Sequence, residues 1–203
     1  MQGLIGKKIG MTQVYDKSGN VIPVTAVEAG PCFVSQIKTK KTDGYNAVQI
    51  AFGKRKRSTK PLEGHLSGAK LSFVPKYFRE FRSDESEKFS VGQEINVTIF
   101  KEGDSVRITG TSIGKGFAGT VKRHHFSRGP MSHGSKSHRI PGSSGAGSTP
   151  GRVLKGTRRA GRMGGERVTI KYVKVIRVDQ GNNVLLLKGA VPGSDNGLLL
   201  ISK

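Results

Sequence analysis

Alternating hydrophobic and polar positions predict β-strands in the first quarter of the chain. Residues 4–15 (LIGKKIGMTQVY) and 21–29 (VIPVTAVEA) flank the turn DKSGN, whose glycine and asparagine readily adopt the positive φ of a hairpin turn. Two further short strands are expected at 33–38 (FVSQIK) and 47–53 (AVQIAFG), separated by a turn that contains Asp-Gly. Strands at this spacing favour a small barrel or sandwich over a parallel sheet.

The same pattern returns later in the chain. INVTIF at 95–100 alternates as a half-buried strand should, and VRITGTS at 106–112 follows it after the turn KEGD. Strand character resumes in 166–179 (ERVTIKYVKVIRVD), 184–191 (VLLLKGAV) and 198–202 (LLLIS), with turn residues between them. The strand-rich pieces before and after the middle of the chain are therefore expected to build one body.

Two short helices are expected between the strands. PLEGHLSGA at 61–69 places a proline where a helix can begin and follows it with small residues. KGFAGTVKRHHF at 115–126 can form a second short helix, which would bury Phe117 and Val121 against the body.

The middle of the chain lacks this periodicity and carries charge of one sign. From Ser105 to Gly165 there is no Asp or Glu, but there are twelve Lys and Arg residues and four of the five histidines. Residues 127–152 (SRGPMSHGSKSHRIPGSSGAGSTPGR) are punctuated by Gly, Ser and Pro, so neither a packed helix nor a regular strand is expected. This segment has too little apolar surface to offset its ordering entropy, so on its own it should be a flexible arm. We call residues 113–165 the arm.

The exclusion of carboxylates indicates what the arm binds. A solvated linker, the alternative, usually mixes both signs of charge, whereas a run of one sign is typical of segments that bind a polyanion. The chain has 35 Lys and Arg against 14 Asp and Glu, a formal net charge of +21; without the twelve bases, 23 remain against 14, a net +9. Nucleic acid is therefore the expected partner. Because aromatic content is 6% with no Trp, recognition through phosphate and shape is favoured over base stacking.

The candidate RNA-binding residues are the bases and histidines of the arm, the first base after it and a basic cluster in the body, KRKR. Guanidinium groups offer forked donors to phosphate, and neutral imidazoles can hydrogen-bond or stack on bases. The KRKR cluster is the weaker signal, since a solvated loop is its alternative. The set comprises Lys54, Arg55, Lys56, Arg57, Lys115, Lys122, Arg123, His124, His125, Arg128, His133, Lys136, His138, Arg139, Arg152, Lys155, Arg158, Arg159, Arg162 and Arg167.

Three motifs could indicate other chemistry, but each lacks the neighbouring residues that the chemistry needs. Gly114, Gly116 and Gly119 spell GxGxxG, but a dinucleotide site needs an acidic residue about 20 positions later, and none occurs before Glu166. The histidines of the arm have irregular spacing and no nearby thiol or carboxylate, which argues against zinc. Serine–histidine catalysis lacks an orienting acid for the same reason. The sequence therefore predicts no enzyme, no cofactor and no metal site.

Cysteine usage and hydropathy bear on the compartment. Cys32 is the single cysteine, so no internal disulfide is possible and the residue is expected to be a small buried hydrophobe. No apolar run approaches the roughly 20 residues of a membrane span. The start, MQGLIGKKIG, lacks the apolar core of a signal peptide, and a cytosolic protein fits these features.

Several long segments have a recognisable order along the chain. They are GLIGKKIGMTQVY near the start, then GTSIGKGFAGTVKRHHF, SHGSKSHRIPGSSG, TPGRVLKGTRRAGRMGGERVT and finally LLLKGAVPG. Together they resemble the large-ribosomal-subunit protein L-three family. The resemblance covers nearly the whole chain, whose compact length is similar to the bacterial or plastid-encoded type.

The resemblance implies a mainly β fold. Its body would be a small antiparallel β-barrel, similar to the second domain of translation elongation factors, with short helices and a long irregular basic extension. Residues 1–112 would form the first part of the barrel body, with a small subdomain inserted at about 54–94. Residues 113–165 would be an extended arm that penetrates rRNA, and 166–203 would supply the last strands of the barrel.

The resemblance also implies a function. Members of this family are structural constituents that bind 23S rRNA near its 3′ end, nucleate subunit assembly and send a basic loop toward the peptidyl-transferase centre. The implied protein partners are the large-subunit proteins L-fourteen and L-nineteen, without a membrane or a homo-oligomer, and the implied location is the ribosome of the cytoplasm or the plastid stroma. The loop tip would comprise Gly142, Ser143, Ser144, Gly145, Ala146, Gly147, Ser148 and Thr149.

Two other classes of function remain open at this point. An RNA-modifying enzyme with a basic guide arm would need a cofactor pocket in addition to the arm. A free protein that compacts nucleic acid would bind any duplex with similar affinity and would not reside in one particle.

Overall fold

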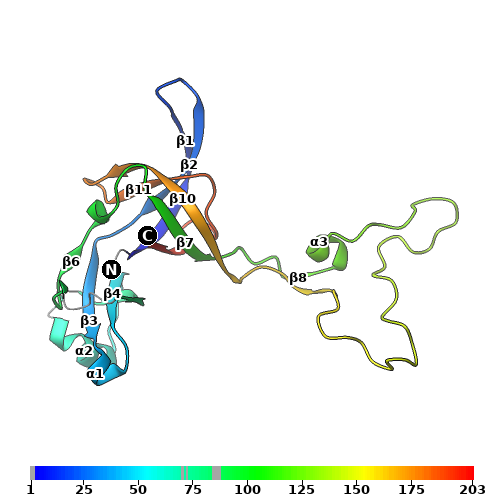
Figure 1. Ribbon diagram of the computed structural model, residues 1–203, viewed down its shortest axis with the longest axis horizontal. Coiled ribbons are helices and arrows are strands. Elements are labelled where there is room, and N and C mark those ends of the chain that lie inside the picture. The colour runs from blue at the N-terminus through cyan, green and yellow to red at the C-terminus, as the bar shows by residue number, and fades with distance from the viewer. Residues whose placement is uncertain (1–2, 70, 72, 84–87) are drawn as a thin grey trace. The chain divides into compact units, whose positions relative to one another are not determined.

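The computed structural model describes residues 3–69, 71, 73–83 and 88–203 (Figure 1). Contacts between residues divide the chain into two units. The first unit, which we call the body, contains the chain up to Ser112 together with Arg167–Lys203. The second unit is Ile113–Glu166, which is the arm with one further residue.

Six strands of the body close into a barrel. Their order around it is β1-β12-β7-β10-β11-β2, and every neighbouring pair is antiparallel. This confirms the expected mainly β fold with a small antiparallel barrel. The strands are β1 (Gly3–Tyr15), β2 (Val21–Glu28), β7 (Ser105–Thr111), β10 (Arg167–Asp179), β11 (Val184–Lys188) and β12 (Leu198–Ser202).

Side chains alternate between the inside and the outside of the barrel. In β7, Val106 and Ile108 are buried whereas Arg107 between them is exposed. Leu185 of β11 and Leu199 of β12 are also fully buried in the same cluster. Each such side chain contributes about 1.5–3 kcal/mol of hydrophobic free energy on burial. The barrel therefore gives the chain a rigid body.

A second sheet packs on the same hydrophobic core. Its order is β5-β4-β3-β6, formed by β3 (Cys32–Lys38), β4 (Ala47–Lys54), β5 (Pro75–Arg82) and β6 (Glu94–Ile95). The strands at 33–38 and 47–53 thus belong to this sheet, whereas the sequence placed them in the barrel body and began the inserted subdomain only at about 54. Alternation shows which face of a strand is buried but not which neighbour supplies its hydrogen bonds.

The helices are few and short. Among the described residues, the body contains α1 (Lys40–Asp43), α2 (Lys60–Leu66) and the 3₁₀ helices Ser67–Ala69 and Val97–Ile99. The second unit contains α3 (Thr120–His124) and the strands β8 (Phe117–Ala118) and β9 (Gly161–Arg162). The helix predicted at 61–69 is confirmed, whereas of the helix predicted at 115–126 only Thr120–His124 forms, because Phe117 and Ala118 lie in β8. Within the described residues, the structure has no helix of the length and apolarity needed to cross a membrane.

The strand predicted at 95–100 is wrong beyond its first residue. Only Glu94 and Ile95 pair with β3, and the chain then turns into the 3₁₀ helix Val97–Ile99. Val97 and Phe100 are both buried. Residues three apart lie on one side of a 3₁₀ turn, so this segment buries its apolar residues without pleating.

Cys32 is a buried thiol, as expected. Its side chain is fully buried and donates a hydrogen bond from Sγ to the carbonyl oxygen of Ile5 at 3.3 Å. Burial raises its pKa to about 12, so the thiol stays protonated and unreactive near neutral pH.

Candidate nucleic-acid interface

A short ribbon and one helical turn form the root of the arm. β8 pairs antiparallel with β9. The ribbon is extended by two backbone hydrogen bonds, from Lys115 N to Met163 O at 2.8 Å and from Met163 N to Gly116 O at 2.9 Å. The root thus joins the outgoing and returning chains of the arm.

Two candidate RNA ligands help to close this root. Arg123 donates from Nη1 to the carbonyl oxygen of Arg159 at 2.9 Å, and His124 Nε2 lies 3.0 Å from the same oxygen. Since a carbonyl only accepts, His124 must carry a proton on Nε2. Gly161 leaves room for Arg123, because a Cβ at that position would lie 2.5 Å from Nη1. Arg123 and His124 therefore have a structural role in the arm.

The expected burial of Phe117 is wrong. Its side chain is 81% exposed, while Ala118 and Thr120 are buried. Successive residues of a strand point to opposite sides, and here the small alanine takes the inward position. Phe117 is left as an exposed apolar side chain at the root.

Beyond the root, the arm is irregular. Residues 126–160 contain neither helix nor strand, which confirms the prediction for this segment. A small loop is closed by Gly129 N–H, which bonds the carbonyl oxygen of His138 at 3.0 Å, and by His138 Nδ1, which donates to Pro130 O at 2.9 Å. The expected tip, 142–149, is wholly exposed, and its hydrogen bonds are local ones, such as that from Ser143 Oγ to Gly145 O at 3.1 Å and that from Gly151 N–H to Gly147 O at 3.0 Å.

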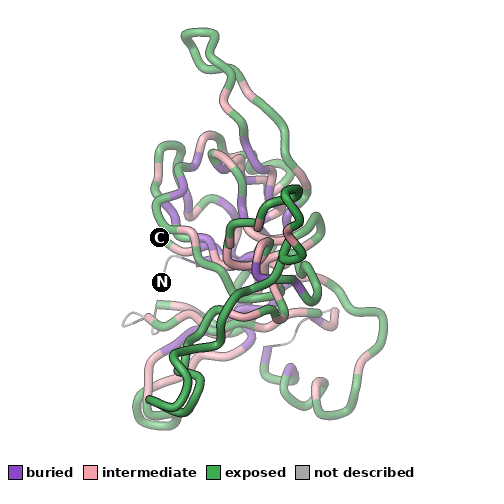
Figure 2. The backbone as a smooth tube through the Cα atoms, turned by 90° about the vertical axis from the view of Figure 1, so that its right-hand side faces the viewer, coloured by how far each residue is buried: buried purple, intermediate pink, exposed green. Residues whose placement is uncertain are grey.

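Most candidate residues of the arm are exposed to solvent, and exposed residues are coloured green along the backbone tube of Figure 2. Arg123, His124 and Arg159 are the half-buried ones. The sequence places no carboxylate between Asp104 and Glu166. The exposed cations therefore belong to a surface that carries no negative side chain of the arm. Such a surface can approach closely spaced phosphates. The exposed candidates are Lys115, Lys122, His125, Arg128, His133, Lys136, His138, Arg139, Arg152, Lys155, Arg158 and Arg162.

The basic cluster of the body lies at the end of a sheet strand. Lys54 is the last residue of β4, and its Nζ lies 5.5 Å from the ring centroid of Phe73. Arg55 N–H bonds the carbonyl oxygen of Val74 at 2.8 Å. All four bases from Lys54 to Arg57 are exposed, so the cluster can also meet phosphate.

The structure adds a basic cleft that the sequence did not reveal. It has a volume of about 400 Å³ and lies where Arg82 of β5, Arg107 of β7 and Arg167 of β10 converge. Glu80 and Lys203 at its edge are already ion-paired, with Lys38 at 3.0 Å and with Asp104 at 2.7 Å. Only Arg167 was among the candidates. The available signals were the net +9 outside the acid-free stretch and Arg107 within that stretch, but counts of charge do not say which bases meet in space.

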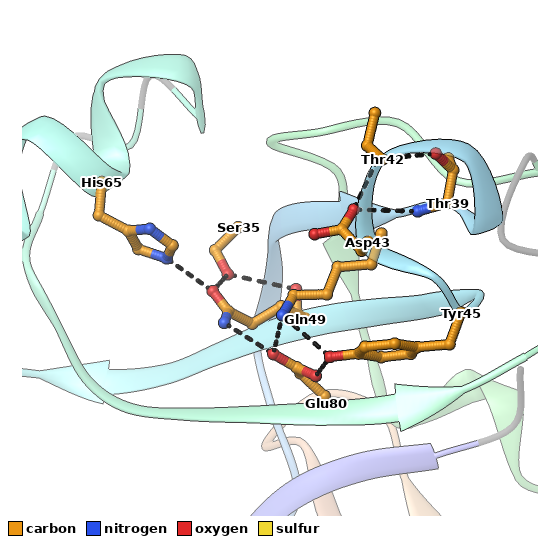
Figure 3. Close-up of polar contacts among 9 residues, drawn as sticks. Ser35, Thr39, Thr42, Asp43, Tyr45, Gln49, His65 and Glu80 are labelled. Atoms are coloured by element: carbon orange, nitrogen blue, oxygen red, sulfur yellow. Dashed lines mark hydrogen bonds and ion pairs between the residues drawn. The ribbon is translucent and has the colours of Figure 1, made fainter.

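The fifth histidine belongs to a polar network on the second sheet (Figure 3). His65 Nε2 lies 2.8 Å from Gln49 Oε1, which also accepts from Ser35 Oγ at 2.7 Å. Glu80 accepts from Tyr45 OH at 2.7 Å and pairs with Lys38. The hydrogen bonds from Tyr45 and Lys38 lower the pKa of Glu80. This network links α2 to three neighbouring strands, so its side chains have a structural role in the second sheet.

The glycine motif set aside in the sequence also fails in space. Gly119 is the N-cap of α3, a helix of five residues, and the strands beside it are antiparallel. A dinucleotide site would instead need a βαβ unit with parallel strands. In the part of the chain that the structure describes, no three His, Cys, Asp or Glu side chains gather as metal ligands.

The fold and the interface together define a small antiparallel β-barrel protein that carries a long, acid-free and largely irregular arm. Residues 51–185 match the family Ribosomal protein L3, and the chain belongs to this family. Three bacterial relatives, each named large ribosomal subunit protein uL3, agree. Those of Synechococcus sp. (strain JA-3-3Ab) and Desulfitobacterium hafniense (strain Y51) are 55% identical over 202 and 203 residues, each covering 98% of this chain and 94% of the relative. The relative from Nostoc punctiforme is 52% identical over 201 residues, which cover 98% of this chain and 95% of the relative. The expected family is confirmed.

Proposed function

We propose that the protein is a structural constituent of the large ribosomal subunit that binds rRNA with its arm. The observation that carries this proposal is the acid-free stretch from Ser105 to Gly165, with its twelve bases, most of them exposed on backbone that lacks helix and strand. Membership of the L3 family supports it, since the relatives are named as large-subunit proteins.

The physical role of the arm follows from its composition. A segment that cannot bury its own apolar surface gains order when RNA surrounds it. Each base that meets a phosphate releases a counterion, which drives binding. The barrel serves as the rigid anchor from which the arm extends, and the KRKR cluster and the arginine cleft give the body its own contacts to phosphate. The protein positions RNA, and any catalysis belongs to the RNA.

The finer assignments follow the family resemblance. They are binding to 23S rRNA near its 3′ end, nucleation of subunit assembly, and neighbouring large-subunit proteins L-fourteen and L-nineteen. The tip at 142–149 is assigned to the vicinity of the peptidyl-transferase centre. Its small, exposed residues support this, because they let backbone approach RNA closely. The assigned location is the ribosome, in the cytoplasm or the plastid stroma.

The salt dependence of rRNA binding tests the role of the arm. One variant replaces Arg128, Lys136, Arg139, Arg152, Lys155 and Arg158 with Gln. If half of these bases meet phosphates, the slope of log K against log salt becomes shallower by roughly 2 to 3 units. The measurement is filter binding of the full chain to a fragment of large-subunit rRNA over a salt series.

A matched control removes the same charge from the body. It replaces exposed lysines outside the candidate set with Gln, at Lys40, Lys41, Lys101, Lys171, Lys174 and Lys188. This control should leave the slope nearly unchanged. Equal slopes for the wild-type chain and the arm variant would mean that the body does the binding.

A further inference from the structure

The β1–β2 hairpin continues past the barrel as a two-stranded ribbon. β1 pairs with β12 only from Gly3 to Lys7, and β2 pairs with β11 only from Val24 to Glu28. Residues 9–23 therefore extend from the barrel with only each other as strand partners in the described structure (Figure 1). An isolated two-stranded ribbon is only marginally stable in water. A binding partner would therefore stabilise the part of the hairpin that extends from the barrel.

One face of this ribbon carries large apolar side chains in solvent. Met11 is 53% exposed, Tyr15 68% and Val21 53%. Tyr15 stands opposite Val21, and Gln13 stands opposite Pro23, so these residues share the face of Met11. Single exposed apolar residues are common, but three large ones on one face of a narrow ribbon, with Gln13 between two of them, favour a contact surface.

The ribbon is almost free of charge in a strongly basic chain. Residues 9–23 contain Asp16 and Lys17 as their only charged groups, a net charge of zero against +21 for the whole chain. Both lie in the turn and not along the strands. A surface for phosphate needs cations, so this ribbon suits an uncharged protein surface and not RNA.

The hydrogen bonds of the turn show which backbone groups point outward. Asp16 N–H bonds the carbonyl oxygen of Asn20 at 2.9 Å, so this pair bonds across the ribbon. Bonding direction alternates along an antiparallel strand, and Met11, Gln13 and Tyr15 therefore direct their N–H and C=O groups to the outer edge of β1. Pro23, opposite Gln13, fits this register, since its carbonyl bonds Gly189 N–H on the outer side of β2 at 2.9 Å.

The two edges of the ribbon differ in what they offer a partner. Pro23 lacks an N–H and blocks strand addition on the outer edge of β2. The outer edge of β1 has neither proline nor charge between Ile9 and Tyr15, although proteins usually protect free edges with such residues. An open, uncharged edge beside an apolar face is the arrangement used for β-strand addition.

We propose that the outer edge of β1 from Met11 to Tyr15 docks an extended, weakly charged strand of another protein. That strand adds to the ribbon as its third strand and packs apolar side chains against Met11 and Tyr15. The partner is a protein of the same particle, so the inference rests on the proposed function.

Photocrosslinking in the assembled particle tests this proposal. A benzophenone amino acid replaces Tyr15 in the full chain, large subunits are isolated after irradiation, and the adduct is treated with nuclease and identified by mass spectrometry. The expected adduct resists nuclease and joins one other protein through an extended, uncharged segment. Gln13→Pro, which removes an outward N–H but no bond within the ribbon, should lower its yield several-fold, whereas Gln13→Ala should not.

A charge variant distinguishes the possible occupants without relying on proline. Met11→Lys should weaken a contact with an uncharged protein strand but strengthen one with RNA. An adduct lost on nuclease treatment, an adduct between two copies of this chain, equal yields for the two Gln13 variants, or no adduct in the sedimented particle would each overturn the proposal. Failure of the unsubstituted chain to sediment with the large subunit would instead contradict the proposed function.

Discussion

At the scale of single residues, one glycine sets how closely two strands of the barrel approach. A Cβ on Gly6 would lie 2.8 Å from Val27 Cγ1 and 2.9 Å from the carbonyl oxygen of Glu28. Gly6→Ala should therefore lower the free energy of unfolding by about 1–3 kcal/mol through overpacking. Gly10 of the same strand has nothing within 4 Å of such a Cβ, so Gly10→Ala is the control. Urea unfolding of both variants makes the comparison, and equal stabilities would contradict this packing.

Glu80 gives a prediction that depends on pH. Hydrogen bonds from Tyr45 and Lys38 hold its pKa below the ordinary 4.5, so its stabilisation is present above that value and is lost as pH falls through the folded pKa. Glu80→Gln should cost about 1 kcal/mol at pH 7, since the group is partly exposed. The difference from wild type should shrink in urea unfolding near pH 3. A difference that stays constant with pH would show that the carboxylate charge contributes nothing.

Burial was easier to predict for some residues than for others. Cys32 could be placed in the core because a lone cysteine with no redox or metal partner is usually a small hydrophobe. Phe117 could not be placed, because its exposure follows from the register of a two-residue strand. Arg82 and Arg107 were also missed as a pair, since only the folded body brings β5 and β7 to one cleft.

At the scale of elements, the arm should be the first part of the free protein to be cleaved. Residues 126–160 lack helix and strand, so a protease can bind their backbone without unfolding the body. We expect trypsin to cut free chain rapidly between Arg128 and Arg162. Lys174 and Arg177 are also exposed, but they are paired within β10, with Ser105 and Leu186, and should be cut slowly.

The same digestion inside the large subunit completes this prediction. RNA that surrounds the arm should protect the sites between Arg128 and Arg162, as followed by mass spectrometry of the fragments. Equal cleavage of free and particle-bound chain would contradict an arm that RNA orders.

Sequence patterns located elements better than they located sheets. The first hairpin could be predicted because its turn residues and its alternation of apolar and polar positions agree. The same agreement made it possible to predict β7, β10, β11 and β12. The segment 95–100 could not, because alternation alone does not distinguish a pleated strand from a short 3₁₀ turn that buries Val97 and Phe100. Membership of β3 and β4 in the second sheet depends on long-range pairing, which local patterns do not encode.

At the scale of the whole molecule, the chain divides its chemistry between two units. The body buries the hydrophobic core, and the second unit holds most of the acid-free stretch. This division could be predicted from composition, since periodicity and one-signed charge occupy different parts of the chain. The nucleotides that each base contacts depend on the folded RNA and not on this sequence.

Sedimentation of a cell lysate in high salt tests whether this protein is a structural constituent of the large ribosomal subunit. The chain would be followed across the gradient by quantitative mass spectrometry. We expect co-migration with the large subunit in a one-to-one ratio to its other proteins. Release into the light fractions would contradict it and would favour a free protein that binds nucleic acid through loosely held charge.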